Sequence, residues 1–505
     1  MISSRVLLLS MALLFGSFSI GLPRAACATE LGVLAPVMVD DQPLKRAAPD
    51  GKPAPVVTRV RSGELYARLQ REAKDGFTAQ VLAIDEAAQL ASGATEAATV
   101  WLYLSLEDGG FPRYGFWLRS GDDDERYMPE PFVDLIVDDN SVESGDFEEI
   151  FAHELGHVML HRLIPRFPMG YSRTPHASLA ITDTPTAFDE GFATHMQGLV
   201  RQFTRNERLR RTDRGLDSKP FLSSWQSNLD RIGRIDGVRR NQFVLSQVPL
   251  PGEPDAIASR DNSTLFDTAR LKTGDQMMAS EGVIATVFYR WLVPGEATNT
   301  ALAERYGRVF EALAVLGRNE LSPDTAILVR LLRSYVGLHP EQGADAMRSF
   351  LETTYATTVD PSVARLYEAL AARGRVGDMA TFVEQLKPAR EELARVVEET
   401  IRTPARLDAA LSPSIWLYTD VNAKVENAKP HPVAYNLNTA EHEHLAALPG
   451  VGGALAAKIV ADRRQRGGYA SLANLAERLK LSGKTVGALA ELNEAAQSAG
   501  TFGRQ

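Results

Sequence analysis

Two histidines four residues apart constrain the fold of this chain most strongly, because they can act together only if a helix carries them. They stand in the segment His153-Glu154-Leu155-Gly156-His157, and five of the nine histidines in 505 residues fall within a stretch of 43. A helix places the two imidazoles one turn apart on one face. The same segment carries an apolar stripe at helical spacing, which supports the helix: Phe147, Ile150, Phe151, Leu155 and Val158.

Paired imidazoles on one helical face are suited to coordinating a single metal ion. Glu154 stands beside them and suits a general base that takes a proton from activated water and returns it to a leaving amine. A third protein ligand is required. His161 continues the series but lies about 12 Å along the helix axis from His153, too far to close around the same ion. The remaining candidates lie in the segment from Phe188 to His195, which predicts the start of a second helix.

His-Glu-x-x-His followed by Glu-Gly-Phe-Ala (from Glu190 to Ala193) resembles the gluzincin clan of metallopeptidases, closely over about fifty residues. The resemblance implies one zinc ion per chain, held by His153, His157 and Glu190, with Glu154 as the base. Glu190 follows His157 by 33 positions, which is compatible with that clan. Two features depart from it: Asp189 replaces the asparagine of many aminopeptidases, and their Gly-x-Met-Glu-Asn strand is absent. Endopeptidase and exopeptidase action therefore both remain open.

A second donor usually stabilises the oxyanion of the transition state. Tyr289, in a helix expected over residues 280–292, and His195 are the candidates. A core aromatic with a satisfied hydroxyl is the competing interpretation of Tyr289. For His161 and His176, a polar surface position or a supporting role behind the ligands is favoured over metal ligation.

A glycine-rich hairpin marks the C-terminal region, at Leu448-Pro449-Gly450-Val451-Gly452. The surrounding fifty residues resemble the helix-hairpin-helix domain of competence-type DNA-binding proteins. This resemblance implies backbone N–H groups near Gly450 and Gly452 that meet a phosphate. The added charge would come from a group of cations: Lys458, Arg463 and Arg464.

The net charge of the C-terminal region supports DNA binding only mildly. Residues 431–505 hold eight Lys and Arg against six Asp and Glu, a net charge of +2 in a chain of net charge −9. DNA-backbone contact and packing against a protein partner therefore both remain open.

The N-terminus has the layout of a secretory signal peptide. Arg5 precedes an apolar run over residues 6–20, and Ala26-Cys27-Ala28 forms a small-x-small cleavage site. The run is short for a membrane span, so we expect a periplasmic or secreted protein with no integral membrane domain after cleavage, or a membrane-anchored one if the segment is uncleaved. Cys27 is the only cysteine. The mature chain then has no disulfide, and any metal is held by His, Asp or Glu.

Short strand-like runs precede a long helical region, which predicts an α+β fold with a small mixed β-sheet, a helical zincin-like metallopeptidase domain and a small all-α helix-hairpin-helix domain. Strands are expected at residues 79–84, 99–106, 116–118 and 132–137, and helices at 64–75, 280–292, 301–316, 323–336, 343–355 and 363–373. The predicted divisions are a signal peptide (1–28), an extended leader (29–60), the metallopeptidase-like domain (61–402), a linker (403–433) and the helix-hairpin-helix domain (434–505).

These patterns together predict an exported zinc metalloprotease, a hydrolase acting on peptide or protein substrates, with a C-terminal module that binds DNA or protein. The alternative is a non-catalytic envelope DNA-binding or adaptor protein in which the peptidase-like part serves only as a scaffold.

Overall fold

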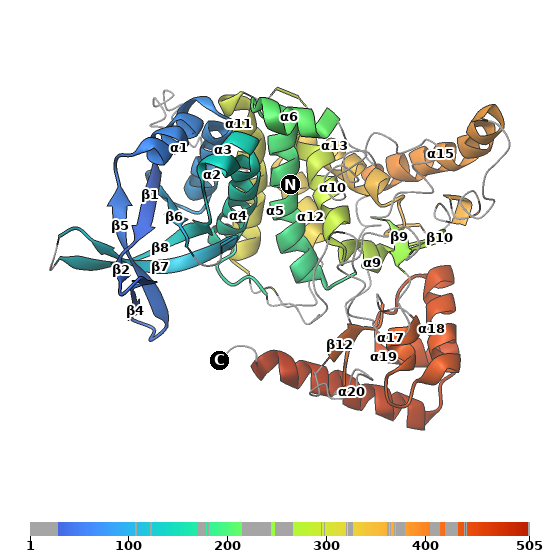
Figure 1. Ribbon diagram of the computed structural model, residues 1–505. Coiled ribbons are helices and arrows are strands. Elements are labelled where there is room, and N and C mark those ends of the chain that lie inside the picture. Colours follow the sequence, from blue (N-terminus) through green and yellow to red (C-terminus); the bar gives the residue numbers. More distant parts are fainter. Residues whose placement is uncertain are drawn as a thin grey trace, which may run out of the picture.

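The computed structural model places a β-rich part at one end of a helical body and a separate C-terminal unit below it (Figure 1). The described residues are 29–106, 109–121, 124–168, 178, 181–214, 244–247, 266–293, 295–296, 298–319, 321, 327–360, 363, 365–367, 369, 379–403, 415–419, 433–438, 440 and 442–502. The predicted signal peptide and His176 lie outside them.

Five strands close into a small barrel. Their order is β1-β6-β8-β7-β5, with β4 beyond β5, and the pairing of β1 with β5 completes the ring. The pairs β1–β6, β6–β8 and β5–β7 are parallel, whereas β7–β8 and β1–β5 are antiparallel. The strands of this region are β1 (Leu31–Pro36), β2 (Met38–Val39), β3 (Gln42–Pro43), β4 (Lys45–Ala47), β5 (Pro53–Val60), β6 (Val100–Leu104), β7 (Phe111–Arg119) and β8 (Glu125–Leu135).

Alternation along the strands divides their side chains between two cores. On β6, Trp101 and Tyr103 point inward and pack with Phe116 and Phe132 at centroid distances of 5.7–5.9 Å. Leu102, between them in sequence, belongs instead to the large core that the helices share. The outer face of the barrel is thereby attached to the helices that carry the site.

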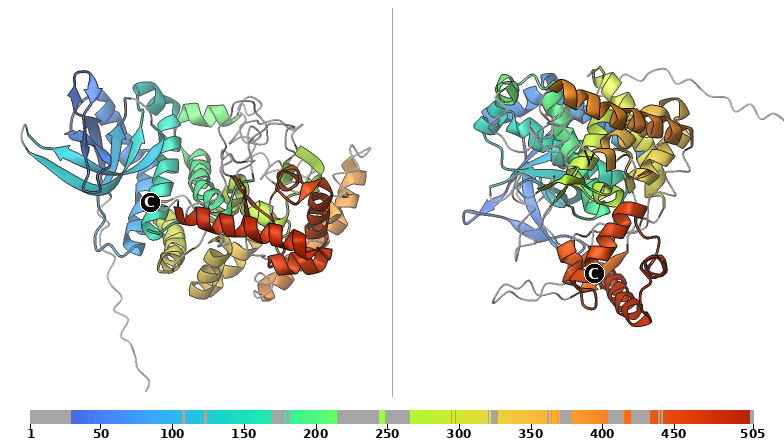
Figure 2. Two further views of the ribbon diagram at one scale, coloured as in Figure 1. Left: turned by 90° about the horizontal axis from the view of Figure 1, so that it is seen from below. Right: turned by 90° about the vertical axis from the view of Figure 1, so that its right-hand side faces the viewer.

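The helical body is built around α4 and α5, which pack against each other, with α2, α10 and α11 on their other sides. Figure 2 shows the body from two further directions, with the barrel at its side. Its helices are α1 (Glu64–Asp75), α2 (Thr78–Ala91), α3 (Asp139–Ser144), α4 (Asp146–Leu163), α5 (Thr184–Phe203), α6 (Glu207–Arg214), α9 (Gly274–Met278), α10 (Glu281–Leu292), α11 (Asn299–Gly317), α12 (Ile327–Leu338), α13 (Pro340–Thr353) and α15 (Met379–Arg402), and a strand pair, β9 (Leu245–Gln247) with β10 (Phe266–Leu271), lies beside α9.

The predicted helices at 64–75, 280–292, 301–316 and 343–355 are confirmed, and so is the helix at 323–336 from Ile327 onward. The strand predicted at 79–84 is wrong, because these residues lie inside α2. Val81, Ile84 and Ala88 are buried at helical spacing, and a mainly apolar run of six residues is too short to distinguish a strand from a buried helix. The strands at 99–106, 116–118 and 132–137 are confirmed as parts of β6, β7 and β8, and most of 363–373 lies outside the described residues.

Residues 29–60 do not form the expected extended leader. Leu31–Pro36 and Pro53–Val60 are barrel strands that pair with β6 and β7, whose residues lie tens of positions later in the chain. Prolines 53 and 55 made this region resemble a linker. The pairing with β6 and β7 over long sequence separation adds to the pairing within the region itself, between β4 and β5 and between β1 and β5.

The C-terminal unit has its own hydrophobic core, which includes Leu445, Ile459 and Tyr469. It is not all-α, because β11 pairs antiparallel with β12 and packs on α20. The predicted linker 403–433 thus contains a strand of this unit. Its elements are β11 (Trp416–Thr419), β12 (Val433–Asn436), α17 (His442–Ala446), α18 (Gly452–Arg466), α19 (Leu472–Leu479) and α20 (Gly483–Phe502). In the described part of the chain, no helix combines the length and apolar character needed to cross a bilayer.

Candidate metal centre

The two helices of the site approach closely because small residues stand where they cross. A Cβ at Gly156 of α4 would lie 3.1 Å from Cα of Ala193 on α5, which is tighter than ordinary van der Waals contact. A Cβ at Gly191 would lie 2.6 Å from Ile284 of α10. The glycines of both motifs therefore allow α4, α5 and α10 to pack together and bring Glu190 to the histidines.

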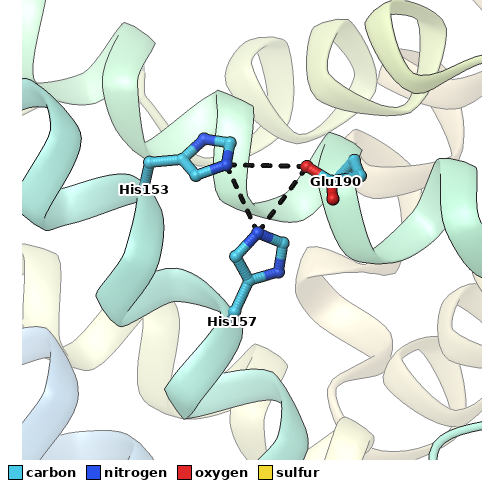
Figure 3. A group of neighbouring side chains, drawn as sticks. All are labelled: His153, His157 and Glu190. Atoms are coloured by element: carbon cyan, nitrogen blue, oxygen red, sulfur yellow. Dashed lines mark hydrogen bonds and ion pairs between the residues drawn. The ribbon is translucent and has the colours of Figure 1, made fainter. Parts of the chain in front are cut away.

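His153, His157 and Glu190 point toward one another from α4 and α5 (Figure 3). The Nε2 atoms of the two histidines are 3.3 Å apart, and Oε2 of Glu190 lies 3.5 Å from His153 and 3.6 Å from His157. A tetrahedral ion with donors at about 2.0–2.1 Å separates any two donors by about 3.3–3.4 Å. The three side chains thus form a group that can hold one metal ion.

Asp189 supports this group from behind and was noted in the sequence only as a departure from a family pattern. Its Oδ1 accepts a hydrogen bond of 2.6 Å from Nδ1 of His157, and its Oδ2 lies 2.9 Å from Nε2 of His161. When the His157 ring is neutral, the bond from Nδ1 leaves the lone pair on Nε2, the atom that lies 3.6 Å from Glu190. His161 is therefore a supporting residue, in agreement with its exclusion as a ligand.

The electrostatics of the group favour a cation. Burial by itself would lower the pKa of His157, but the bond to Asp189 and the surrounding carboxylates raise that pKa to about 9. Burial would likewise raise the pKa of Asp189, yet hydrogen bonds from His157 and His161 hold it well below its usual range. The negative charge of the surrounding carboxylates keeps a proton on His157. The same charge would favour a divalent cation in place of that proton.

Glu154 lies next to the ligand group and is only 6% exposed. Burial raises the pKa of its carboxyl group, and the adjacent His153 and His157 partly oppose that rise. A Cβ at Gly110 would lie 3.9 Å from its Oε1, so Glu154 faces the start of β7. A carboxylate whose pKa is raised toward neutrality is suited to both accepting and returning a proton.

The start of β7 offers an edge beside the ligands. Residues 111–114 pair with β8 on one side, whereas β5 pairs with β7 only at Trp117 and Leu118. Among the described strands, none covers the other edge of residues 111–114. Tyr114, at the end of this edge, lines a pocket together with His161 and Asp189.

Neither predicted oxyanion donor lies in the site. His195 is fully buried, with Nδ1 on the carbonyl of Phe192 and Nε2 3.0 Å from the hydroxyl of Tyr306, and burial lowers its pKa to about 3. Tyr289 donates to Gln202 at 3.0 Å. Gln202 lies twelve residues beyond Glu190 on α5, about 18 Å along the axis. These two residues serve helix packing.

The predicted phosphate-binding residues divide into two groups. Gly450 and Gly452 form an exposed hairpin with φ values of +78° and +64°, and Lys458 is exposed on α18. Arg463 is 2% exposed and donates to the carbonyl oxygens of Leu437 and Ala440.

Arg464 reaches out of the C-terminal unit and donates to the carbonyl oxygen of Leu271 at 3.0 Å. Arg463 therefore stabilises the C-terminal unit itself, and Arg464 stabilises its contact with the helical body. The spacing of these arginines along the helix could not reveal either role.

A cation near the hairpin comes instead from α20. A Cβ at Gly450 would lie 3.1 Å from Cβ of Ala488 on α20. Lys484 stands one turn before Ala488 on the same face and is exposed. The first hairpin and the start of α20 thus share one surface.

Comparison with known proteins assigns the C-terminal unit only. No curated protein matches the chain, and no solved structure matches it. Residues 433–492 match the helix-hairpin-helix motif family, which confirms the resemblance seen around Gly450.

Proposed function

We propose that this protein is a zinc-dependent peptidase whose ion is held by His153, His157 and Glu190. The observation that carries the proposal is the triangle of donor atoms with sides of 3.3, 3.5 and 3.6 Å. Two imidazoles and one carboxylate are the donor set of zinc sites that keep a fourth position open for water. A surface pair of histidines would need neither the third donor nor the carboxylate behind His157.

The residues around the ligands provide the other functions that hydrolysis requires. Zinc in this site would lower the pKa of water and polarise the scissile carbonyl. Glu154 takes the proton from the attacking water and delivers it to the leaving amine. The edge at residues 111–114 that no described strand covers can pair with an extended peptide by main-chain hydrogen bonds, which places a peptide bond beside Glu154.

The test compares metal content with hydrolysis in the mature full-length chain. We expect one zinc ion per chain by elemental analysis, and cleavage of an unfolded protein such as denatured casein. A chelator should stop cleavage, and added zinc should restore it. A chain that holds no zinc and cuts nothing would favour the adaptor alternative.

We also propose that the protein is exported, because residues 1–28 have the order of a secretory signal and contain the only cysteine. Mass spectrometry of the mature protein should find Thr29 at its N-terminus. Retention of the first 28 residues would indicate a membrane-anchored form instead.

Asp189→Ala is expected to weaken zinc binding by about 10–100-fold, the usual effect of losing a carboxylate that orients a histidine ligand. Without the bond to Nδ1, His157 can adopt the wrong tautomer or rotate. Competition with a chromophoric chelator measures the affinity. Asp189→Asn keeps an oxygen acceptor and should lose less zinc affinity than Asp189→Ala. Equal zinc affinity in the wild type and both variants would contradict the supporting role of Asp189.

We further propose that the C-terminal unit binds the phosphate backbone of DNA, which the family match and the exposed hairpin at Gly450 and Gly452 support. In the full chain, Lys484→Glu should weaken duplex binding and reduce the salt dependence by about one unit of log Kd per log salt. Lys52→Glu, on the distant barrel, is the charge-matched control. Binding that ignores salt and both variants would indicate a protein partner.

A further inference from the structure

We infer that the pocket at the C-terminal end of α4 selects a bulky apolar side chain of the peptide substrate. The inference rests on the proposed peptidase function and names the substrate class of that site. The pocket encloses about 490 Å³ and has Asp189 and His161 in one wall. Asp189 precedes the ligand Glu190 and contacts the ligand His157, so the pocket adjoins the metal centre.

The distance from the metal centre suits a residue close to the scissile bond. His161 lies one helical turn, about 6 Å, beyond His157 along α4. An extended peptide advances about 3.4 Å per residue and repeats its side-chain direction every two residues. A peptide paired with the edge of β7 therefore reaches the pocket with a side chain one or two positions from the cleaved bond.

The walls of the pocket are mainly apolar. Ile164, Pro165, Phe167, Pro168 and Pro185 form most of them. None of the described residues in the lining is a lysine or arginine. The charge of Arg162 reaches Tyr114, but this guanidinium is already paired with Asp85 at 2.6 Å.

The polar side-chain atoms of Asp189 and Thr186 in the lining are already bonded. Both carboxylate oxygens of Asp189 contact histidines, and the hydroxyl of Thr186 donates to Asp183 at 3.0 Å. An apolar or aromatic side chain is therefore the occupant with the smallest desolvation cost, because it has no polar group that would need a new partner in the pocket.

The pocket is also preformed. Phe167 stacks on His161 at 5.5 Å and on Phe188 at 6.4 Å, and Ile164 is 1% exposed. His161 is in turn held by Asp189. Because the walls need little ordering on binding, filling the pocket contributes to selection among peptides.

The substitution Thr186→Trp tests this inference, because Thr186 lines the pocket from the first turn of α5 and ligates nothing. The tryptophan side chain fills the space, whereas Thr58→Trp adds the same side chain at an exposed position of β5, outside the pocket lining. In the zinc-loaded full chain, profiling with a peptide library should show a preference for Phe, Leu or Met at one position near the cut.

Thr186→Trp should lower kcat/KM for those peptides by about tenfold or more and leave peptides with Ala there nearly unchanged. Thr58→Trp should follow the wild type. The same profile in all three proteins would overturn the inference.

A binding measurement separates this inference from the peptidase proposal. N-acetyl-phenylalanine amide and N-acetyl-alanine amide are titrated into Glu154→Gln by NMR, with and without Thr186→Trp. Preferential binding of the phenylalanine probe, lost on filling the pocket, supports the inference even if no hydrolysis is found. Equal binding of the two probes overturns it even if the wild type is an active peptidase.

Discussion

Replacing Glu154 by glutamine is expected to lower peptide hydrolysis by about 10²–10⁴-fold, the usual contribution of a general base. The amide keeps the size of the side chain but cannot accept the proton of the attacking water. Zinc content should stay at one ion per chain, because the three donor atoms belong to other residues. The measurement is kcat/KM on a fluorogenic peptide, with elemental analysis of the same sample.

Glu143→Gln is the matched control, since Glu143 is exposed on α3 and pairs with Arg208. It should hydrolyse the peptide at the wild-type rate. Unchanged activity in Glu154→Gln would show that Glu154 is not the general base, whichever metal the site holds.

Glu190→Ala should abolish stable zinc binding, and with it hydrolysis. Structural zinc sites bind with about 10–16 kcal/mol, so losing one of three protein donors should cost roughly 4 kcal/mol, or about a thousandfold in Kd. Dialysis against a weak chelator followed by elemental analysis should find zinc in the wild type and none in the variant. Circular dichroism checks that both remain folded.

Glu304→Ala provides the control, because Glu304 is exposed on α11 and the change preserves helix propensity. The two main variants also differ from each other in an informative way. Glu154→Gln should keep the metal and lose activity, whereas Glu190→Ala should lose both. Full zinc retention in Glu190→Ala would mean that the donor triangle is not the metal site.

Much of the candidate site could be predicted from the sequence, since its parts are local. The spacing of His153 and His157 places them on one helical face, and the Glu-Gly-Phe-Ala run marked the second helix. The structure brings Glu190 to both histidines. The importance of Asp189 was missed, because its two histidine contacts depend on how α5 lies across α4.

The errors in the fold have a common cause. Strands β1 and β5 looked like a linker because β6 and β7, with which they pair, lie far away in sequence. The start of α2 looked like a strand because a short, mainly apolar run does not by itself distinguish a strand from a buried helix. Arg463 and Arg464 looked like free cations for the same kind of reason. Their carbonyl partners, on Leu437, Ala440 and Leu271, are distant in sequence.

By itself, the sequence determined which side chains can share a helical face and where a glycine hairpin turns, because backbone geometry alone decides both. Only the tertiary structure decided which helices cross, since that depends on packing at Gly156, Ala193 and Gly191. The crossing in turn decides that Glu190 reaches the histidines, that Asp189 holds His157 in place, and that an apolar pocket opens beside them. Such contacts arise from side chains meeting across long sequence separations, which no local pattern encodes.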